Sequence, residues 1–237
     1  MTPKILIMVL SCGAHPFDRL MRAQQRTWDS IDWPDVRTVF YIGGACMDRW
    51  DGNILRLRID DGYDWMLEKF ALALRILWDL EWDYVFRTNA SSYVCKRKLA
   101  DVASLLPRTK VYGGVIGKTS IGRTHVGGSG MFLSRDVIDL LMDNIKPRHQ
   151  TSCVEDGEIG HILGDLGVPC MEIPRCEYYS CKGTLPDVHH YKCRPPIPPE
   201  QLHPDRDDDI KAMEKIHALK HENSPLPMQP WGFRPVG

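Results

Sequence analysis

Two acidic side chains, Glu155 and Asp156, stand at the start of a segment that is predicted to be helical over residues 155–166. The first turn of a helix fixes the direction of a carboxylate, and the positive end of the helix keeps it ionised. Such a carboxylate can act as a general base that takes a proton from a hydroxyl group. Acidic residues also occur at helix starts for stability alone, so a catalytic and a stabilising role are both open.

A second polar segment, residues 87–92, ends a predicted strand over residues 82–87. Ligands of open α/β sheets bind at such strand ends. Asn89 and Ser91 carry no charge, and their side chains are poor ligands for a hard divalent cation compared with carboxylates. The segment therefore suggests a binding site without a strong metal site.

The elements that must position these residues alternate between strand and helix from residue 4 onward. Strands are predicted at residues 4–10, 36–42, 54–59, 82–87, 111–116, 131–133 and 170–173. Helices are predicted at residues 16–30, 64–80, 98–106, 135–144 and 155–166. Ser134 is expected to cap the fourth helix by offering its hydroxyl to free backbone amides. This order predicts an α/β fold with a mixed, mostly parallel central sheet flanked by helices.

Composition sets wide bounds on the function. The 237 residues carry a formal net charge of -1, which gives no electrostatic argument for binding nucleic acid or an anionic membrane. The apolar run at residues 5–10 is too short to span a bilayer and lacks a signal-peptide cleavage pattern. We expect a cytoplasmic, soluble protein with no membrane span. The sequence predicts no oligomeric state.

Three segments, in chain order, resemble motifs of the Fringe and β1,3-galactosyltransferase group, glycosyltransferase family 31. Residues 22–28, RAQQRTW, are similar to its R-x-A-I-R-x-T-W signature, one residue shorter here. Residues 127–141, GGSGMFLSRDVIDLL, are similar to its G-G-G-Y-x-L-S-R-D-x-V segment. Residues 154–168, VEDGEIGHILGDLGV, resemble its E-D-V-x-x-G-x-C-L-x-x-L-G-I segment.

A fourth segment, residues 84–94, keeps the outline of that family's donor-site strand. It reads YVFRTNASSYV where the family has roughly YVxKTDDDxFV, and Lys69 looks like the lysine that precedes this strand. Together the four segments cover roughly residues 5–170. Each motif is short, but their common order is more specific than any one of them.

The resemblance implies a GT-A fold and an inverting transfer of a sugar from a UDP-sugar to an acceptor hydroxyl on a glycan. The family's catalytic base corresponds to Asp156, with Glu155 beside it. A free-standing domain of this kind suggests a bacterial or viral setting. The alternatives are an inactive nucleotide-sugar or glycan-binding protein that keeps the GT-A fold, and a different α/β nucleotide-binding enzyme.

The resemblance and the strand ends together suggest a set of donor-binding residues. They are Ser11, Cys12, Gly13, Arg19, Arg26, Lys69, Arg87, Thr88, Asn89, Ser91, His190 and Lys192. The loop at residues 11–19 follows the first strand, which is the natural place for the base and ribose. Asp60, Asp61 and Asp64 follow the third strand and either bind ribose or an ion, or form a solvated turn with a helix cap.

The family holds a divalent ion, Mn²⁺ or Mg²⁺, with the first and third carboxylates of the donor-site strand. Asn89 and Ser91 replace both carboxylates, so only these two and His190 remain as metal candidates, and the sequence argues against a metal cofactor. The charge of a leaving diphosphate must then be offset by cations. Candidates are Arg87, Lys118, Arg123, His189, His190, Lys192 and Arg194, although the two histidines also fit a surface loop.

The glycine-rich loop at residues 122–130 is a candidate acceptor site. Gly128 and its neighbouring glycines let the backbone approach a sugar ring closely. His125 and Ser129 offer hydrogen bonds to sugar hydroxyls. A flexible surface loop is the alternative interpretation.

The remaining signals concern the C-terminal part of the chain. Cys176, Cys181 and Cys193 lie near the two histidines, which suggests zinc, but the spacing lacks paired CxxC knuckles and ordinary thiols fit better. Residues 1–194 are expected to form the catalytic domain. Residues 195–237 form a proline-rich tail with a short polar helix, packed on the domain or mobile, with Trp231 and Phe233 as anchors.

Overall fold

The computed structural model describes residues 2–145, 155–181, 184–198, 201 and 204–221. The expected anchors Trp231 and Phe233 lie outside these residues, as does Cys153. No helix in the described part of the chain is long and apolar enough to cross a membrane.

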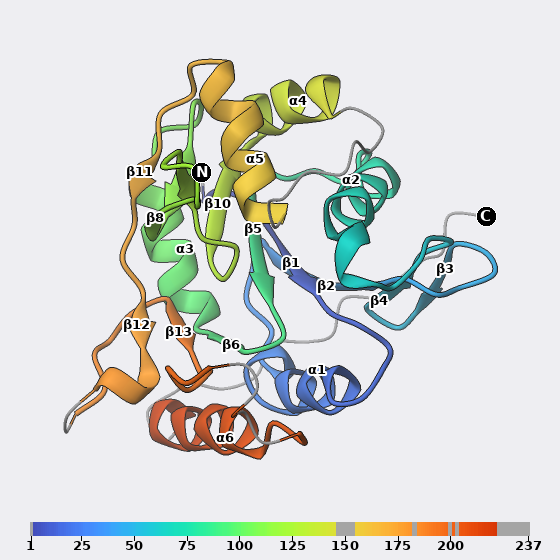
Figure 1. The fold of residues 1–237 in the computed structure, drawn as a ribbon. Coiled ribbons are helices and arrows are strands. Elements are labelled where there is room, and N and C mark those ends of the chain that lie inside the picture. The colour runs from blue at the N-terminus through green and yellow to red at the C-terminus, as the bar shows by residue number, and fades with distance from the viewer. Residues whose placement is uncertain (1, 146–154, 182–183, 199–200, 202–203, 222–237) are drawn as a thin grey trace.

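A mixed sheet of eight strands forms the centre of the molecule (Figure 1). Its spatial order is β11-β7-β10-β5-β1-β2-β4-β3. The strands are β1 (Ile5–Leu10), β2 (Val36–Ile42), β3 (Arg49–Asp51), β4 (Ile54–Arg56), β5 (Tyr84–Asn89), β7 (Tyr112–Gly114), β10 (Met131–Ser134) and β11 (Met171–Glu172). The four adjacent strands β5, β1, β2 and β4 are parallel, whereas β10 runs antiparallel to both of its neighbours. The predicted α/β class with a mixed, mostly parallel sheet is confirmed.

Helices cover both faces of this sheet. One face carries α1 (Phe17–Arg26), α3 (Lys96–Leu105) and α6 (Asp207–His221), and the other carries α2 (Met66–Ile76), α4 (Arg135–Asn144) and α5 (Glu155–Asp165). Strand β1 shows why both faces are covered: Ile5, Ile7 and Val9 enter one core cluster, and the alternate residues enter the other. Burying each such side chain contributes about 1.5–3 kcal/mol to folding. This contribution would be lost on a face of the sheet that stayed exposed to water.

Within the described ranges, two small sheets and three short 3-10 helices accompany the central sheet. Strands β6 (Ser92–Val94), β12 (Cys176–Glu177) and β13 (His190–Lys192) form one sheet, and β8 (Ile116–Lys118) and β9 (Thr124–Val126) form a hairpin. The 3-10 helices are η1 (Trp28–Ser30), η2 (Tyr63–Trp65) and η3 (Tyr178–Ser180). These strands of two or three residues are too short to show an alternating pattern in the sequence.

The C-terminal helix α6 packs beside α1 at the lower end of the view in Figure 1. The predicted helix is present, but it is not polar on all sides. Ile210, Met213 and Ile216 recur at helical spacing and are buried in the core cluster that α1 also enters. The helix therefore belongs to the packed body of the protein.

The predicted capping role of Ser134 is wrong. Ser134 precedes α4, but its side chain makes no capping hydrogen bond. Its hydroxyl accepts a hydrogen bond from the Val111 N–H at 2.9 Å and donates to Asp136 at 2.6 Å. The side chain thus ties the strand region around Val111 to the start of α4.

Candidate functional site

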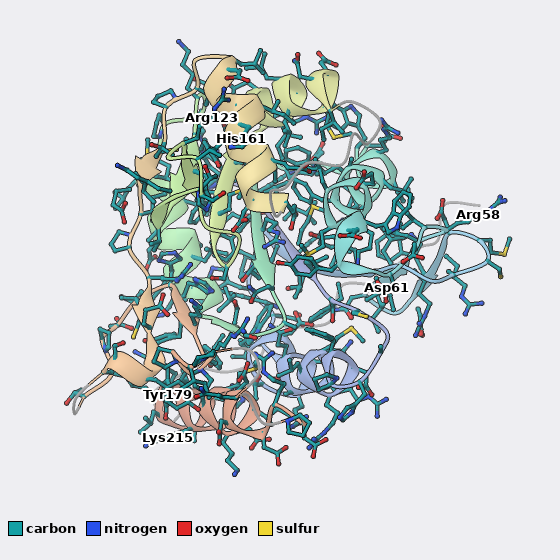
Figure 2. All side chains as sticks on the ribbon, viewed as in Figure 1. Arg58, Asp61, Arg123, His161, Tyr179 and Lys215 are labelled. Carbon is teal, nitrogen blue, oxygen red and sulfur yellow. The ribbon has the colours of Figure 1, made fainter. Side chains whose placement is uncertain are left out.

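The carboxyl ends of the four parallel strands meet at one edge of the sheet, where open α/β sheets bind ligands. Asp61, in the loop that follows β4, lies at this edge (Figure 2). Its carboxylate accepts hydrogen bonds from the Gly13 and Gly43 N–H groups, both at 2.7 Å, and from Lys69 Nζ at 2.8 Å. The side chain therefore links the loops after β1, β2 and β4 to helix α2.

Asp61 and Lys69 form a charged pair that is largely shielded from water. The Lys69 side chain is 2% exposed and that of Asp61 is 19% exposed. Partial burial raises the pKa of Asp61, but Lys69 and the two glycine N–H groups outweigh it and hold the pKa below its usual range. The sequence suggested a ribose ligand or a solvated turn here. The observed carboxylate instead holds the strand-end loops together.

A second charged pair, Arg87 and Glu155, lies buried between β5 and the start of α5. The Arg87 guanidinium donates two hydrogen bonds to the Glu155 carboxylate and a third to the Gly128 carbonyl. Complete burial raises the pKa of Glu155 to about 7, against the opposing effect of the Arg87 charge. Because Arg87 is 3% exposed and bonded in this way, it fixes the position of α5 and presents no accessible cation.

Asp156, the next residue, is only half-buried and has a different environment. One carboxylate oxygen accepts a hydrogen bond from the Gly128 N–H at 2.8 Å, and the other accepts one from the Gly157 N–H at 2.9 Å. Each oxygen keeps a further lone pair. The two N–H groups fix the direction of the carboxylate and leave it able to accept a proton.

The glycine loop is packed against the protein itself. A Cβ atom on Gly128 would lie 2.5 Å from Arg87 Nη1, and one on Gly130 would lie 2.6 Å from His190 Nδ1. Gly130 also has a φ of 113°, which side chains rarely adopt. These glycines are required for close internal contacts, and the alternative of a flexible surface loop is wrong for Gly128 and Gly130.

The two neighbouring histidines are buried, so the surface-loop interpretation is wrong. His189 is 5% exposed and His190 is fully buried, and both rings pack edge-on against Phe86. Burial lowers the pKa of His189 to about 4 and also lowers that of His190, so both are neutral at pH 7. His190 Nε2 lies 3.4 Å from the Thr88 hydroxyl.

The turn between β5 and β6 contains Asn89 and Ser91, which were singled out from the sequence as weak metal candidates. Asn89 Oδ1 accepts hydrogen bonds from the Ser91 N–H and the Ser92 hydroxyl, both at 3.1 Å. The Ser91 hydroxyl accepts a hydrogen bond from Arg206 Nη2 at 2.8 Å, and Arg206 also pairs with Asp209. The C-terminal part of the chain thus brings a guanidinium to the Ser91 side chain.

These residues do not suit a divalent ion. Asn89 already accepts two hydrogen bonds, Ser91 faces a positive charge, and His190 is sealed in the core. In the described part of the chain, no group of three or more His, Cys, Asp or Glu side chains is arranged to hold a metal. The described cysteines around Cys176, which suggested zinc, form no such group either.

Two predicted donor residues on α1 lie elsewhere. Arg19 pairs with Asp207 at 2.9 Å, and Arg26 pairs with Glu214 at 2.6 Å. Both arginines therefore face the C-terminal segment and join α1 to it. Lys192 lies on β13, the central strand of the three-stranded sheet, and its Nζ is 3.6 Å from Glu177 Oε2.

Ser11 and Cys12 stay at the carboxyl edge of β1, as predicted. The Ser11 hydroxyl is buried and makes no hydrogen bond to any described group. Cys12 Sγ accepts a hydrogen bond from the Ala14 N–H at 3.4 Å, and burial raises its pKa. The loop after β1 therefore contains a polar atom without a partner beside the Asp61 network.

The predicted acceptor residues separate into two groups. Ser129 stays with Gly128, and its carbonyl accepts a hydrogen bond from Arg175 at 2.7 Å. His125 instead packs in the β8–β9 hairpin against α5. A Cβ atom added to Gly160 would lie 2.4 Å from the Cβ of His125. Arg123, in the same hairpin, pairs with Asp165 at 2.7 Å and lies far from Asp61 in Figure 2. Lys118 is exposed in β8.

A hollow of about 520 Å³ lies in this hairpin region, between the hairpin and the later turns of α5. Its lining includes Arg123, Gly160, Gly164 and Cys170. The ion pair between Arg123 and Asp165 in this lining is exposed to solvent. We place the candidate site at the strand ends, where the buried ionisable groups gather.

Tyr63 was not predicted as part of the site, whereas Arg194 was predicted as one of the cations that could offset the charge of the diphosphate. Tyr63, in η2, is 70% exposed, and partial desolvation together with the charges of Asp156 and Glu155 raises its pKa, while the charge of Arg194 opposes this. Burial raises the pKa of Asp209, and the charges of Arg206 and Arg194 oppose that rise. Arg194 itself is half-buried in the segment that follows β13.

No known protein-family model matches the chain, and no curated protein matches it either.

Proposed function

We propose that this chain is a GT-A glycosyltransferase that moves a sugar from a UDP-sugar to an acceptor hydroxyl with inversion at the anomeric carbon. The observation that carries the proposal is the contrast between the two adjacent acids. Glu155 is buried and paired with Arg87, whereas Asp156 is half-buried and, among the described residues, accepts hydrogen bonds from two backbone N–H groups. Two acids that only stabilised the start of the helix would not need such different environments, one buried against an arginine and one open to solvent.

In this proposal Asp156 is the general base. The acceptor hydroxyl donates its proton to an Asp156 carboxylate oxygen while the acceptor oxygen bonds to the anomeric carbon. The bond from that carbon to the UDP oxygen breaks, and UDP leaves from the opposite face. The Gly128 and Gly157 N–H groups keep the carboxylate aimed throughout.

The same proposal assigns the leaving diphosphate to cations. Arg194 is half-buried and forms no hydrogen bond or ion pair with any residue in the described ranges. The proposal therefore assigns Arg194 to offset the negative charge that develops on the leaving diphosphate. Arg206 holds the Ser91 turn, and no metal step is needed.

A catalytically inactive nucleotide-sugar-binding protein is the second candidate. It is favoured by the Asn89–Ser91 turn, which has lost both acidic ligands, and by the full pairing of Arg87. Such a protein would bind a nucleotide sugar at the same strand ends but would not turn it over.

Calorimetry and a turnover assay together test the proposal. UDP, ADP and GDP are titrated into the full chain with EDTA and then with Mn²⁺, and UDP-sugars are assayed for hydrolysis or transfer. We expect UDP to bind in EDTA and at least one UDP-sugar to be consumed. Binding without turnover of any UDP-sugar would favour the second candidate, and no uridine nucleotide binding at millimolar concentration would exclude both.

A further inference from the structure

Two thiols meet at the corner between β12 and η3. The Sγ atoms of Cys176 and Cys181 are 2.9 Å apart. An S–S bond is about 2.05 Å long, so the two sulfur atoms need to approach by only about 0.9 Å to bond. Among the described cysteines, this is the one pair whose sulfur atoms are in contact.

The pair lies in a segment that joins the candidate site to the C-terminal helix. Arg175, immediately before Cys176, donates a hydrogen bond to the Ser129 carbonyl of the glycine loop. Tyr179, between the two cysteines, donates a hydrogen bond to the Asp208 carbonyl in α6 at 2.8 Å. A covalent change at the thiols therefore acts on a connection between two parts of the fold.

We propose that Cys176 and Cys181 are a modification site at which the chain forms a reversible disulfide by exchange with a small disulfide such as oxidised glutathione. The Cys181 thiolate attacks one glutathione sulfur, and a mixed disulfide forms while the first reduced glutathione leaves. The Cys176 sulfur then attacks Cys181 Sγ, and the second reduced glutathione leaves. Two thiol protons pass to the two glutathione thiolates, so two protein thiols are oxidised and one glutathione disulfide is reduced.

Exposure sets the order of these two steps. Cys181 is half-exposed and meets a solvent-borne disulfide first, whereas Cys176 is 6% exposed. Burial, followed by the contact with Cys181, raises the pKa of Cys176 to about 12, so it is a poor first nucleophile. Its sulfur nevertheless lies beside the Cys181 sulfur that it must attack.

Peptide mapping tests the site directly, because trypsin releases both cysteines in one peptide. Residues 176–182, CEYYSCK, follow Arg175 and end at Lys182. The full-length chain is equilibrated in glutathione buffers of increasing oxidation, starting once from reduced and once from oxidised protein, and is then alkylated in denaturant. We expect a doubly alkylated peptide in reduced glutathione. In oxidised glutathione we expect an unalkylated peptide lighter by two hydrogen atoms than the dithiol.

Two serine variants serve as matched controls. In Cys176→Ser, we expect Cys181 to retain glutathione because no second thiol displaces it. In Cys181→Ser, we expect Cys176 to stay unmodified because it is buried. A doubly alkylated wild-type peptide in fully oxidised glutathione, reached from both starting states, would overturn the proposal. A disulfide from either cysteine to a third one, such as Cys193, would overturn it as well.

Discussion

Arg87 and Glu155, 68 residues apart in the chain, face each other in a buried ion pair that joins β5 to the first turn of α5. Removing one partner leaves an uncompensated buried charge, which typically costs about 3–5 kcal/mol. We therefore expect Arg87→Leu to lower the free energy of unfolding by about that amount in urea denaturation. The double variant Arg87→Leu with Glu155→Leu should recover most of the loss.

The exposed pair Arg123 and Asp165 is a suitable control for that experiment. Its removal by Arg123→Leu should change stability much less, because solvent screens exposed charges. Equal losses in the two experiments would show that burial of the Arg87 pair is not the cause.

Replacing Asp156 by Asn tests the proposed base. Loss of a general base typically lowers turnover about 10²- to 10⁴-fold, and we expect UDP affinity to change little. Asn also has one acceptor oxygen for two N–H donors, so stability should fall by about 1 kcal/mol. The variant is compared with wild type by UDP-sugar turnover, UDP calorimetry and urea denaturation. Wild-type turnover in this variant would refute the assignment.

The role of Asp61 is tested against its neighbour Asp60. Asp61→Ala removes the carboxylate that pairs with buried Lys69 and leaves only the hydrogen bond to the main-chain carbonyl of residue 61, so we expect a loss of about 3 kcal/mol in the free energy of unfolding. Asp60 accepts one hydrogen bond, from the Gly62 N–H, so Asp60→Ala should cost much less. UDP affinity should also fall in Asp61→Ala alone, since the strand-end loops lose their common link. Similar effects from both variants would contradict this role.

Acidification should destabilise the protein through His189. The pKa of this residue is about 4 in the folded chain and 6.5 without burial. The unfolded chain therefore binds a proton first, and stability that is present above pH 6.5 is lost as the pH falls toward 4. The shift corresponds to about 3 kcal/mol. Urea denaturation between pH 7 and pH 4 should show a shallower pH dependence for His189→Phe than for wild type.

Arg194 should contribute to affinity for the diphosphate and not for the nucleoside. We expect Arg194→Gln to weaken UDP binding roughly 10- to 100-fold, the range for losing one charge-assisted hydrogen bond. Uridine binding should be unchanged. Arg26→Gln is the control, because Arg26 pairs with Glu214 away from the strand ends. A uniform loss for UDP and uridine would point to disruption of the fold.

Periodicity predicted the larger elements well, because a six- or seven-residue buried strand and an amphipathic helix leave clear patterns. The strand at residues 36–42 and the helix at residues 135–144 have the predicted bounds. The helix predicted over residues 64–80 is shorter, Met66–Ile76, since η2 occupies its first turn. The short strands β6, β12 and β13 were missed.

The site was predicted only in part, because its contacts join residues that are far apart in the chain. Gly13 and Asp61 are separated by 48 residues, and Ser91 and Arg206 by 115. Contacts between residues so far apart in the chain produce no local pattern in the sequence. Lys69 was predicted to bind the donor through a family resemblance, and its observed partner, Asp61, was not predicted from the sequence. Arg19 and Arg26 were misassigned because a motif does not show which face of a helix a distant segment covers.

The hydrogen bond from the Gly128 N–H to Asp156 has a consequence for mutational screens. Its donor belongs to the main chain, so no exchange of side chains in the loop removes it while the loop keeps its path. A library that varies the loop would report collisions, such as those with Arg87 and His190, and the aim of the carboxylate would go unnoticed. An amide-to-ester replacement at Gly128, introduced by chemical ligation, deletes that single donor and leaves every side chain in place.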